Sequence, residues 1–375
     1  MLWHSALVAH FYTNRCHAPC TRRGCPFPWR LAIISRVVVL SERYLVMKED
    51  EMYAYIFNSL IFKRWHWYGY HFTQRLRGGS HPFAESILEA CLACDTAMPG
   101  YAKRVVDLMA AASGREKNER ERDYEQLLQL LAELLVVRQV VTFEWSFPVS
   151  FHSEPRAAGS KRNPEITVAG PQFHLGVEVK APALLEHQRK RAQNETQIPA
   201  RAFTPERLKI VTQGKEFTLP RDNPVKDFLI SADAKFAAFK RADPNFIGLL
   251  VIVWDDHVYE PISSLIHDDA GLFTDNSFAR DANGEPLRFS NVDGVVVIRH
   301  LHQFVNIAGD RGPVDGAQHA LDYGRAGEFP WKVFIENPQG HAVPEVVLEC
   351  FQALPPSPVL GAEYSPKDLV WWFRM

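Results

Sequence analysis

Glu165, Glu178 and Lys180 have the residue types and the spacing to act together chemically. Residues 173–181 alternate strictly, so a β-strand there carries its apolar side chains on one face and Glu178 and Lys180 on the other. Residues 165–169 alternate in the same way, with Glu165 on the polar side. One face of a sheet could therefore hold two carboxylates and an amino group.

The turn between these two segments decides whether Glu165 meets the other two residues. Gly170-Pro171 is typical of a turn, and a tight turn there places Glu165 opposite Gly176, which has no side chain to obstruct it. Opposed residues of an antiparallel pair share a face, so Glu165 would lie diagonally beside Glu178 and on the same side as Lys180. We therefore expect the three side chains to converge.

Two convergent carboxylates repel each other unless a proton or a cation lies between them. Hard oxygen ligands of this kind suit Mg²⁺ or Mn²⁺ better than zinc. Such an ion can polarise a phosphodiester and lower the pKa of a bound water, and a neighbouring lysine can orient that water or stabilise the charge on phosphorus. The constellation fits phosphodiester hydrolysis.

The motif Asn163-Pro164-Glu165, followed after twelve residues by Glu178-Val179-Lys180, resembles the signature of the PD-(D/E)XK nuclease superfamily. The resemblance implies that Glu165 and Glu178 are metal ligands, that Lys180 is the catalytic lysine, and that the core has the order αβββαβ. The first acid departs from the pattern, because Glu165 stands where the family usually has Asp.

The family often adds a carboxylate from the helix before the first strand, and here Glu125 and Glu133 compete for that role. The apolar stripe of this helix is formed by Tyr124, Leu127, Leu128, Leu131 and Leu135. At 100° per residue Glu125 lies on a flank of the stripe, whereas Glu133 falls nearly opposite. We choose Glu125 as the fourth catalytic residue and the third metal ligand.

The elements that must position these residues follow in a simple order. The charged run at 115–125 begins a long helix, and strands are predicted at 140–151, 165–169, 173–181, 246–254, 294–301 and 343–351, with a helix at 225–242. The fold class is therefore α/β (α+β), a restriction-endonuclease-like αβββαβ core with a mixed central sheet, preceded by a small helical region.

Four segments divide the chain. Residues 1–46 mix Cys, His, Arg and Pro without periodicity, and we expect them to be an irregular leader that is not translated, with Met47 as the initiator. Residues 47–118 form the helical region, 119–300 the nuclease-like core with an insertion at 183–225, and 301–375 a C-terminal extension of unassigned role.

The insertion is rich in basic residues. We predict that Arg189, Lys190 and Arg191, together with Lys235 on the following helix, lie along a phosphate backbone. A solvated surface loop is the competing interpretation of the same charges.

Composition sets wider limits. A formal charge of −2 provides no overall attraction to nucleic acid, so any nucleic-acid contact must come from a local basic patch. A content of 46% hydrophobic residues suffices for a packed core. Six cysteines without a disulfide-framework spacing favour reduced thiols and a cytoplasmic location. No apolar run reaches the length of a membrane span.

The first functional hypothesis is a Mg²⁺- or Mn²⁺-dependent DNA endonuclease, with restriction, defence, repair and toxin settings all open. The alternative is a catalytically inactive nuclease-fold module that binds nucleic acid or a protein partner. Many nucleases of the family dimerise to cut both strands, so the resemblance also suggests a homodimer. The sequence shows no P-loop, dinucleotide-binding glycine pattern or G-x-S-x-G elbow.

Overall fold

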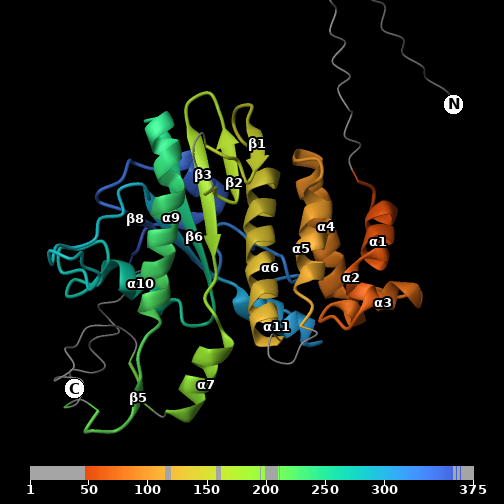
Figure 1. Cartoon of the computed structure of the whole chain (residues 1–375), viewed down its shortest axis with the longest axis horizontal. Coiled ribbons are helices and arrows are strands. Elements are labelled where there is room, and N and C mark those ends of the chain that lie inside the picture. Colours follow the sequence, from red (N-terminus) through yellow and green to blue (C-terminus); the bar gives the residue numbers. More distant parts are fainter. Residues whose placement is uncertain are drawn as a thin grey trace, which may run out of the picture. The chain divides into compact units, whose positions relative to one another are not determined.

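A mixed sheet of seven strands lies at the centre of the described structure (Figure 1). The computed structural model describes residues 47–114, 120–157, 162–194, 196–198, 210, 212–357, 360 and 364, which belong to one compact unit, Tyr44–Met375. The predicted leader 1–46 lies outside the described residues.

The sheet has the order β1-β2-β3-β6-β7-β8-β9. Its strands are β1 (Ser150–Ser153), β2 (Ile166–Ala169), β3 (His174–Lys180), β6 (Phe246–Trp254), β7 (Gly294–Arg299), β8 (Lys332–Glu336) and β9 (Ala353–Leu354). β3, β6 and β7 are parallel, whereas β2 is antiparallel to both β1 and β3. β6 is buried along its whole length, as expected of a central parallel strand covered on both faces.

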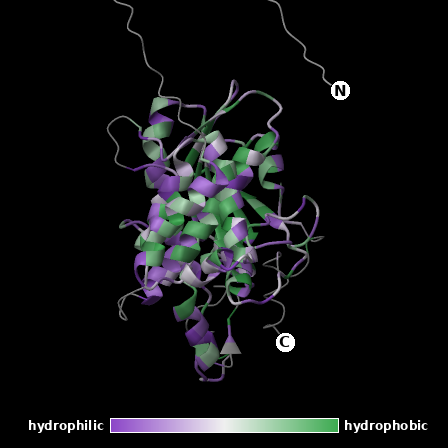
Figure 2. Ribbon diagram, turned by 90° about the vertical axis from the view of Figure 1, so that its right-hand side faces the viewer, coloured by the Kyte–Doolittle hydropathy of each residue, from purple (hydrophilic) through white to green (hydrophobic). Residues whose placement is uncertain are grey.

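Helices cover both faces of the sheet. One face packs against α6 (Arg120–Thr142), α11 (Leu301–Ala308) and α12 (Glu345–Phe351), and the other against α9 (Asp222–Ala242) and α10 (Tyr259–Ile266). Along β3, Val177 and Val179 join the core under α6. Figure 2 shows hydrophobic segments concentrated at the centre of the molecule.

Five helices form the N-terminal region: α1 (Glu49–Asn58), α2 (Leu60–Lys63), α3 (Gly69–Leu76), α4 (Pro82–Ala97) and α5 (Tyr101–Ala111). α6 stands between α4 and the sheet, and its apolar residues are buried on all sides (Figure 1). The predicted α/β class, helical N-terminal region and mixed sheet are confirmed. None of the helices among the described residues combines the length and apolar character needed to cross a bilayer.

The strand predicted at 140–151 is wrong except at its end. α6 continues through Thr142, and β1 begins only at Ser150. Val137 and Val140 are buried at helical spacing, so packing outweighs the strand preference of these β-branched residues.

The strand predicted at 343–351 is also wrong, because this segment forms α12. Pro344 is the N-cap, and Val347, Cys350 and Phe351 recur at helical spacing and are buried. The region predicted as a C-terminal extension adds β8 and β9 to the same sheet.

The insertion at 183–225 leaves the sheet after β3 and returns at the start of α9. Its described part contains α7 (Leu185–Gln193) and a small parallel pair, β4 (Thr196–Gln197) with β5 (Phe217–Thr218).

Candidate active site

β3 carries Glu178 and Lys180 on the sheet face that α9 covers. Glu178 is fully buried, and the Lys180 Nζ lies 2.7 Å from its Oε1. The neighbour of Glu178 on β6 is Leu250, a residue of the core under α9. The alternation of β3 thus delivers a buried carboxylate and a lysine side by side.

Glu165 lies level with Glu178. The Glu165 N–H donates to the carbonyl oxygen of Val177 (3.0 Å), and the next residue, Ile166, pairs with Val177. The predicted partner, Gly176, lies opposite Thr167 instead. The predicted register is therefore wrong by two residues, a shift that leaves Glu165 on the predicted face because side chains alternate with a period of two.

The turn explains the shift. Ala169 and His174 form the last pair of the hairpin, so the loop is centred on Pro171-Gln172 and not on Gly170-Pro171. Proline, with its fixed φ, suits the first corner of a turn. Gly176 serves packing, because a Cβ there would lie 2.3 Å from the ring of Phe246.

α6 supplies a third carboxylate, Glu133, where β2 no longer covers β3. Beyond Val177 the edge of β3 is free of β2, and the Gln129 side chain takes that place. Its Nε2 donates to the Val179 carbonyl oxygen (3.0 Å), and its Oε1 accepts from the Ala181 N–H (2.6 Å). The same Nε2 donates to Glu133 (2.9 Å) and so holds this carboxylate beside the strand.

Glu125, the predicted helix acid, is held elsewhere. Its carboxylate accepts hydrogen bonds from the backbone N–H groups of Leu184 and Leu185 at the start of α7 (2.8–2.9 Å). There it neutralises the positive end of a helix, a structural contact. The helical wheel assumed a single apolar stripe, whereas α6 is enclosed by helices on one side and the sheet on the other, so the wheel does not indicate which acid lies nearest the cluster.

Lys235 comes from α9 and lies inside the cluster. Its ammonium donates to both carboxylate oxygens of Glu178 (2.6 and 2.8 Å) and lies 3.5 Å from Glu165. From the sequence we predicted that this lysine contacts a phosphate backbone. Its contact with Glu178 depends on how α9 packs across β3, and no local pattern in the sequence reports that packing.

Charge in the cluster is unbalanced, with three carboxylates against two ammonium groups. Burial, followed by the charges of Glu133 and Glu178, raises the pKa of Glu165 to about 8, although Lys235 and Lys180 oppose the rise. Burial also raises the pKa of Glu133. Burial lowers the pKa of Lys235, but its attraction to Glu178 and Glu165 prevails and the net pKa is raised.

The donor chemistry of the cluster fits a hard divalent cation, because three carboxylates are what Mg²⁺ and Mn²⁺ favour. The three carboxylates are too far apart, as they stand, to coordinate one ion together. No group of three or more His, Cys, Asp or Glu side chains among the described residues is close enough to hold a metal ion as it stands. Lys235 takes both oxygens of Glu178, so an ion would have to displace its ammonium.

The predicted phosphate-binding residues of the insertion each contact an acid. The pairs are Arg189 with Glu121 (3.0 Å), Lys190 with Glu186 (2.7 Å) and Arg191 with Glu260 (2.6 Å). The first two pairs are exposed, whereas Arg191 is half-buried and Glu260 is buried. A phosphate could therefore compete for Arg189 and Lys190 at the surface, while Arg191 is already paired with the buried Glu260.

Comparison of the chain with family models, with curated proteins and with solved structures found no match.

Proposed function

We propose that the chain is a metal-dependent nuclease that hydrolyses phosphodiester bonds, with DNA as its substrate. The observation that carries the proposal is the meeting of Glu133, Glu165 and Glu178 with two lysines, an arrangement in which the pKa of Glu165 rises to about 8. Strongly perturbed carboxylates gathered around a lysine are characteristic of catalytic sites. The element order α6-β1-β2-β3-α9-β6 and the motif around Glu165 and Lys180 support the resemblance to PD-(D/E)XK nucleases.

Each residue has a distinct role in this proposal. Glu133, Glu165 and Glu178 would hold Mg²⁺ or Mn²⁺, which when bound polarises the phosphodiester and lowers the pKa of a water ligand. Lys180, next to Glu178, would orient the attacking water and stabilise charge on the phosphorus. Lys235, once released from Glu178, would be free to contact a phosphate oxygen.

Cleavage of supercoiled plasmid by the full chain tests the proposal. The reactions contain Mg²⁺, Mn²⁺ or EDTA, and single-stranded DNA and RNA serve as further substrates. We expect metal-dependent nicking that falls about 100-fold or more in Lys180→Ala, because a group that stabilises transition-state charge is lost. Lys63→Ala is the matched control, since this lysine is exposed at the end of α2.

Thermal unfolding of each variant separates loss of chemistry from loss of fold. Lys180→Ala that melts like the wild type but does not cleave supports the catalytic role. Equal cleavage by Lys180→Ala and wild type would remove Lys180 from the mechanism.

One contact favours a second function, a catalytically inactive module that binds nucleic acid or a protein partner. Lys235 already neutralises Glu178 through both oxygens, as a resident cation would. Intact plasmid, single-stranded DNA and RNA with either metal, combined with DNA retardation in gels containing EDTA, would favour this module over the nuclease.

A further inference from the structure

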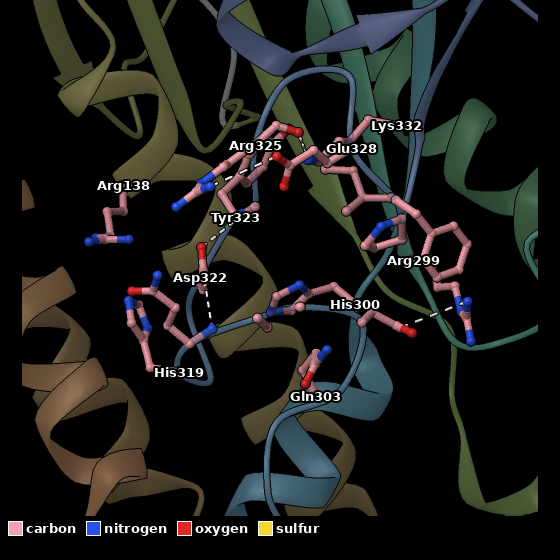
Figure 3. A pocket seen from close by; sticks show the side chains of 18 residues that line it. Arg138, Arg299, His300, Gln303, His319, Asp322, Tyr323, Arg325, Glu328 and Lys332 are labelled. Atoms are coloured by element: carbon pink, nitrogen blue, oxygen red, sulfur yellow. Dashed lines mark hydrogen bonds and ion pairs between the residues drawn. The ribbon is translucent and has the colours of Figure 1, made fainter.

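A pocket of about 370 Å³ lies where β7 ends and β8 begins, on the sheet face that carries α11 and α12. Its walls come from the end of β7, from the segment 315–330 and from Arg138 of α6 (Figure 3). The volume falls in the range of small-molecule sites. The pocket shares no lining residue with the carboxylate cluster described above.

Lys332 is the unusual group in this pocket. The residue is 3% exposed, and its ammonium donates to two neutral oxygens, Gln352 Oε1 (2.9 Å) and the Arg325 carbonyl (3.4 Å). Tyr323 offers its ring face with a centroid 5.1 Å away. Gly324, at φ 81°, allows its backbone to approach the Lys332 ammonium closely, since a Cβ there would lie 3.2 Å from the Lys332 Nζ.

The acids nearest to Lys332 are directed to other donors. Asp322 accepts from the backbone N–H groups of Gln318 (2.7 Å) and Gly324 (2.9 Å). Glu328 lies 3.8 Å from Arg325. Figure 3 shows Arg325, Glu328 and Lys332 gathered at one end of the pocket. Among the described residues Lys332 forms no ion pair, a costly state for a buried ammonium.

The remaining titratable groups leave the pocket favourable to an anion. His300 is buried with its Nε2 2.7 Å from the Ala320 carbonyl oxygen, and burial lowers its pKa to about 4, so it is neutral near pH 7. Arg138 donates from Nη1 to the Leu321 carbonyl and from Nη2 to Glu89 (2.5 Å), and its buried Nε has no partner.

We propose that this pocket binds a small molecule through a carboxylate or phosphate group that contacts Lys332. The anion forms the ion pair that no described side chain provides to Lys332. The rest of the ligand fills the space beside His300 and Tyr323. This site is independent of the proposed nuclease chemistry.

Thermal unfolding of the full chain in EDTA tests the site, with acetate, inorganic phosphate or adenosine 5′-monophosphate against chloride at equal ionic strength. We expect one of these anions at 10 mM to raise the wild-type Tm by about 2 °C or more. A larger effect of acetate indicates a carboxylate ligand, whereas a larger effect of the two phosphates indicates a phosphorylated one. The absence of a shift with all three probes overturns the proposal.

Lys332→Met identifies the group responsible. This variant should lose the anion-induced rise while melting at or above the wild-type Tm in chloride, because it removes an unpaired buried charge. The exposed Lys215→Met is the matched control and should keep the rise. An undiminished rise in Lys332→Met contradicts the proposal.

The wild type alone provides a second test if Lys332→Met does not fold. Burial lowers the pKa of Lys332 to about 8, against the opposing charges of Asp322 and Glu328. Acetate keeps its charge between pH 7 and pH 9, whereas Lys332 loses most of its own. The acetate-induced rise should therefore shrink at pH 9, and an equal rise at both pH values counts against Lys332.

Discussion

Two buried clusters of charge in this protein differ in how completely their charges are paired. The first is the candidate active site, formed by Glu133, Glu165, Glu178, Lys180 and Lys235. The second, the arginine network, links the insertion to α10 and the end of β6 and consists of Arg191, Arg221, Asp255 and Glu260.

The arginine network matches its acids with cations. The Arg221 guanidinium donates to both oxygens of Asp255 (2.6 Å) and to Glu260 (2.9 Å), and stacks over the Trp254 ring. Burial raises the pKa of Glu260, but nearby His187, Arg221 and Arg191 lower it to about 2. Burial raises the pKa of Asp255, with Arg221 opposing.

The two glutamates show what the difference means. Glu165 and Glu260 are both largely buried, yet the pKa of one rises to about 8 and that of the other falls to about 2. The neighbouring cationic side chains stabilise Glu260 as an anion, so this ion-pair network has a structural role. Glu165 lacks that support, and such a deficit of positive charge is where an external cation gains most.

Breaking the arginine network should have the largest effect on stability. Arg221→Met leaves two buried carboxylates without their main partner, and we expect the free energy of unfolding to fall by about 3–5 kcal/mol in urea titrations. Arg189→Met, whose partner Glu121 is exposed, should lose about 0–1 kcal/mol. Similar losses in the two variants would mean that the network is not a structural anchor.

Isosteric changes of the two glutamates should act in opposite directions. In EDTA at pH 8.5, Glu260→Gln should destabilise the protein and Glu165→Gln should stabilise it, each by on the order of 3–5 kcal/mol, since a tenfold change in an ionisation constant corresponds to about 1.4 kcal/mol. Changes of the same sign would show that the two clusters are not distinct.

The pH dependence follows from the same pKa values. Folded Glu165 keeps its proton up to about pH 8, whereas the ordinary value is 4.5, so its effect on wild-type stability is an increasing loss as pH rises from 4.5 through 8. The contribution of Glu260 is complete above pH 4.5 and is lost as pH falls toward 2. Denaturant titrations of wild type and Glu165→Gln between pH 5 and 9 should diverge as pH rises.

The sequence reveals the parts of the candidate active site that depend on local patterns. Alternation along β3 was enough to place Glu178 and Lys180 on one face, and the motif before β2 marked Glu165. Glu133 and Lys235 join them through tertiary packing, because Gln129 fills the free edge of β3 and α9 crosses the sheet.

The arginine network was missed for the same reason. Its members are spread over α7, the start of α9, the end of β6 and α10, so no spacing connects them. Arg191 was predicted to contact phosphate together with its neighbours, and its burial against Glu260 appears only in three dimensions. A run of basic residues in sequence does not reveal which of them face inward.

Adding a divalent metal should change stability by a smaller amount than these substitutions, and only through the candidate active site. If Mg²⁺ or Mn²⁺ binds with a Kd of about 1 mM, 10 mM metal should stabilise the wild type by about 1.4 kcal/mol. The gain should be larger at pH 9 than at pH 6.5, because the ion must displace the Glu165 proton. Glu165→Gln should lose most of the gain, and unchanged stabilisation in that variant would place the metal elsewhere.

The smallest effect on stability is expected at Lys190, which lies next to Arg191 in α7 but faces solvent. Lys190→Ala should leave the denaturation midpoint unchanged, because its pair with Glu186 is exposed. If Lys190 contacts a phosphate of bound DNA, the variant should still weaken binding, and the slope of log affinity against log salt should decrease by about 1. An unchanged slope would show that Lys190 contacts no phosphate of the bound DNA.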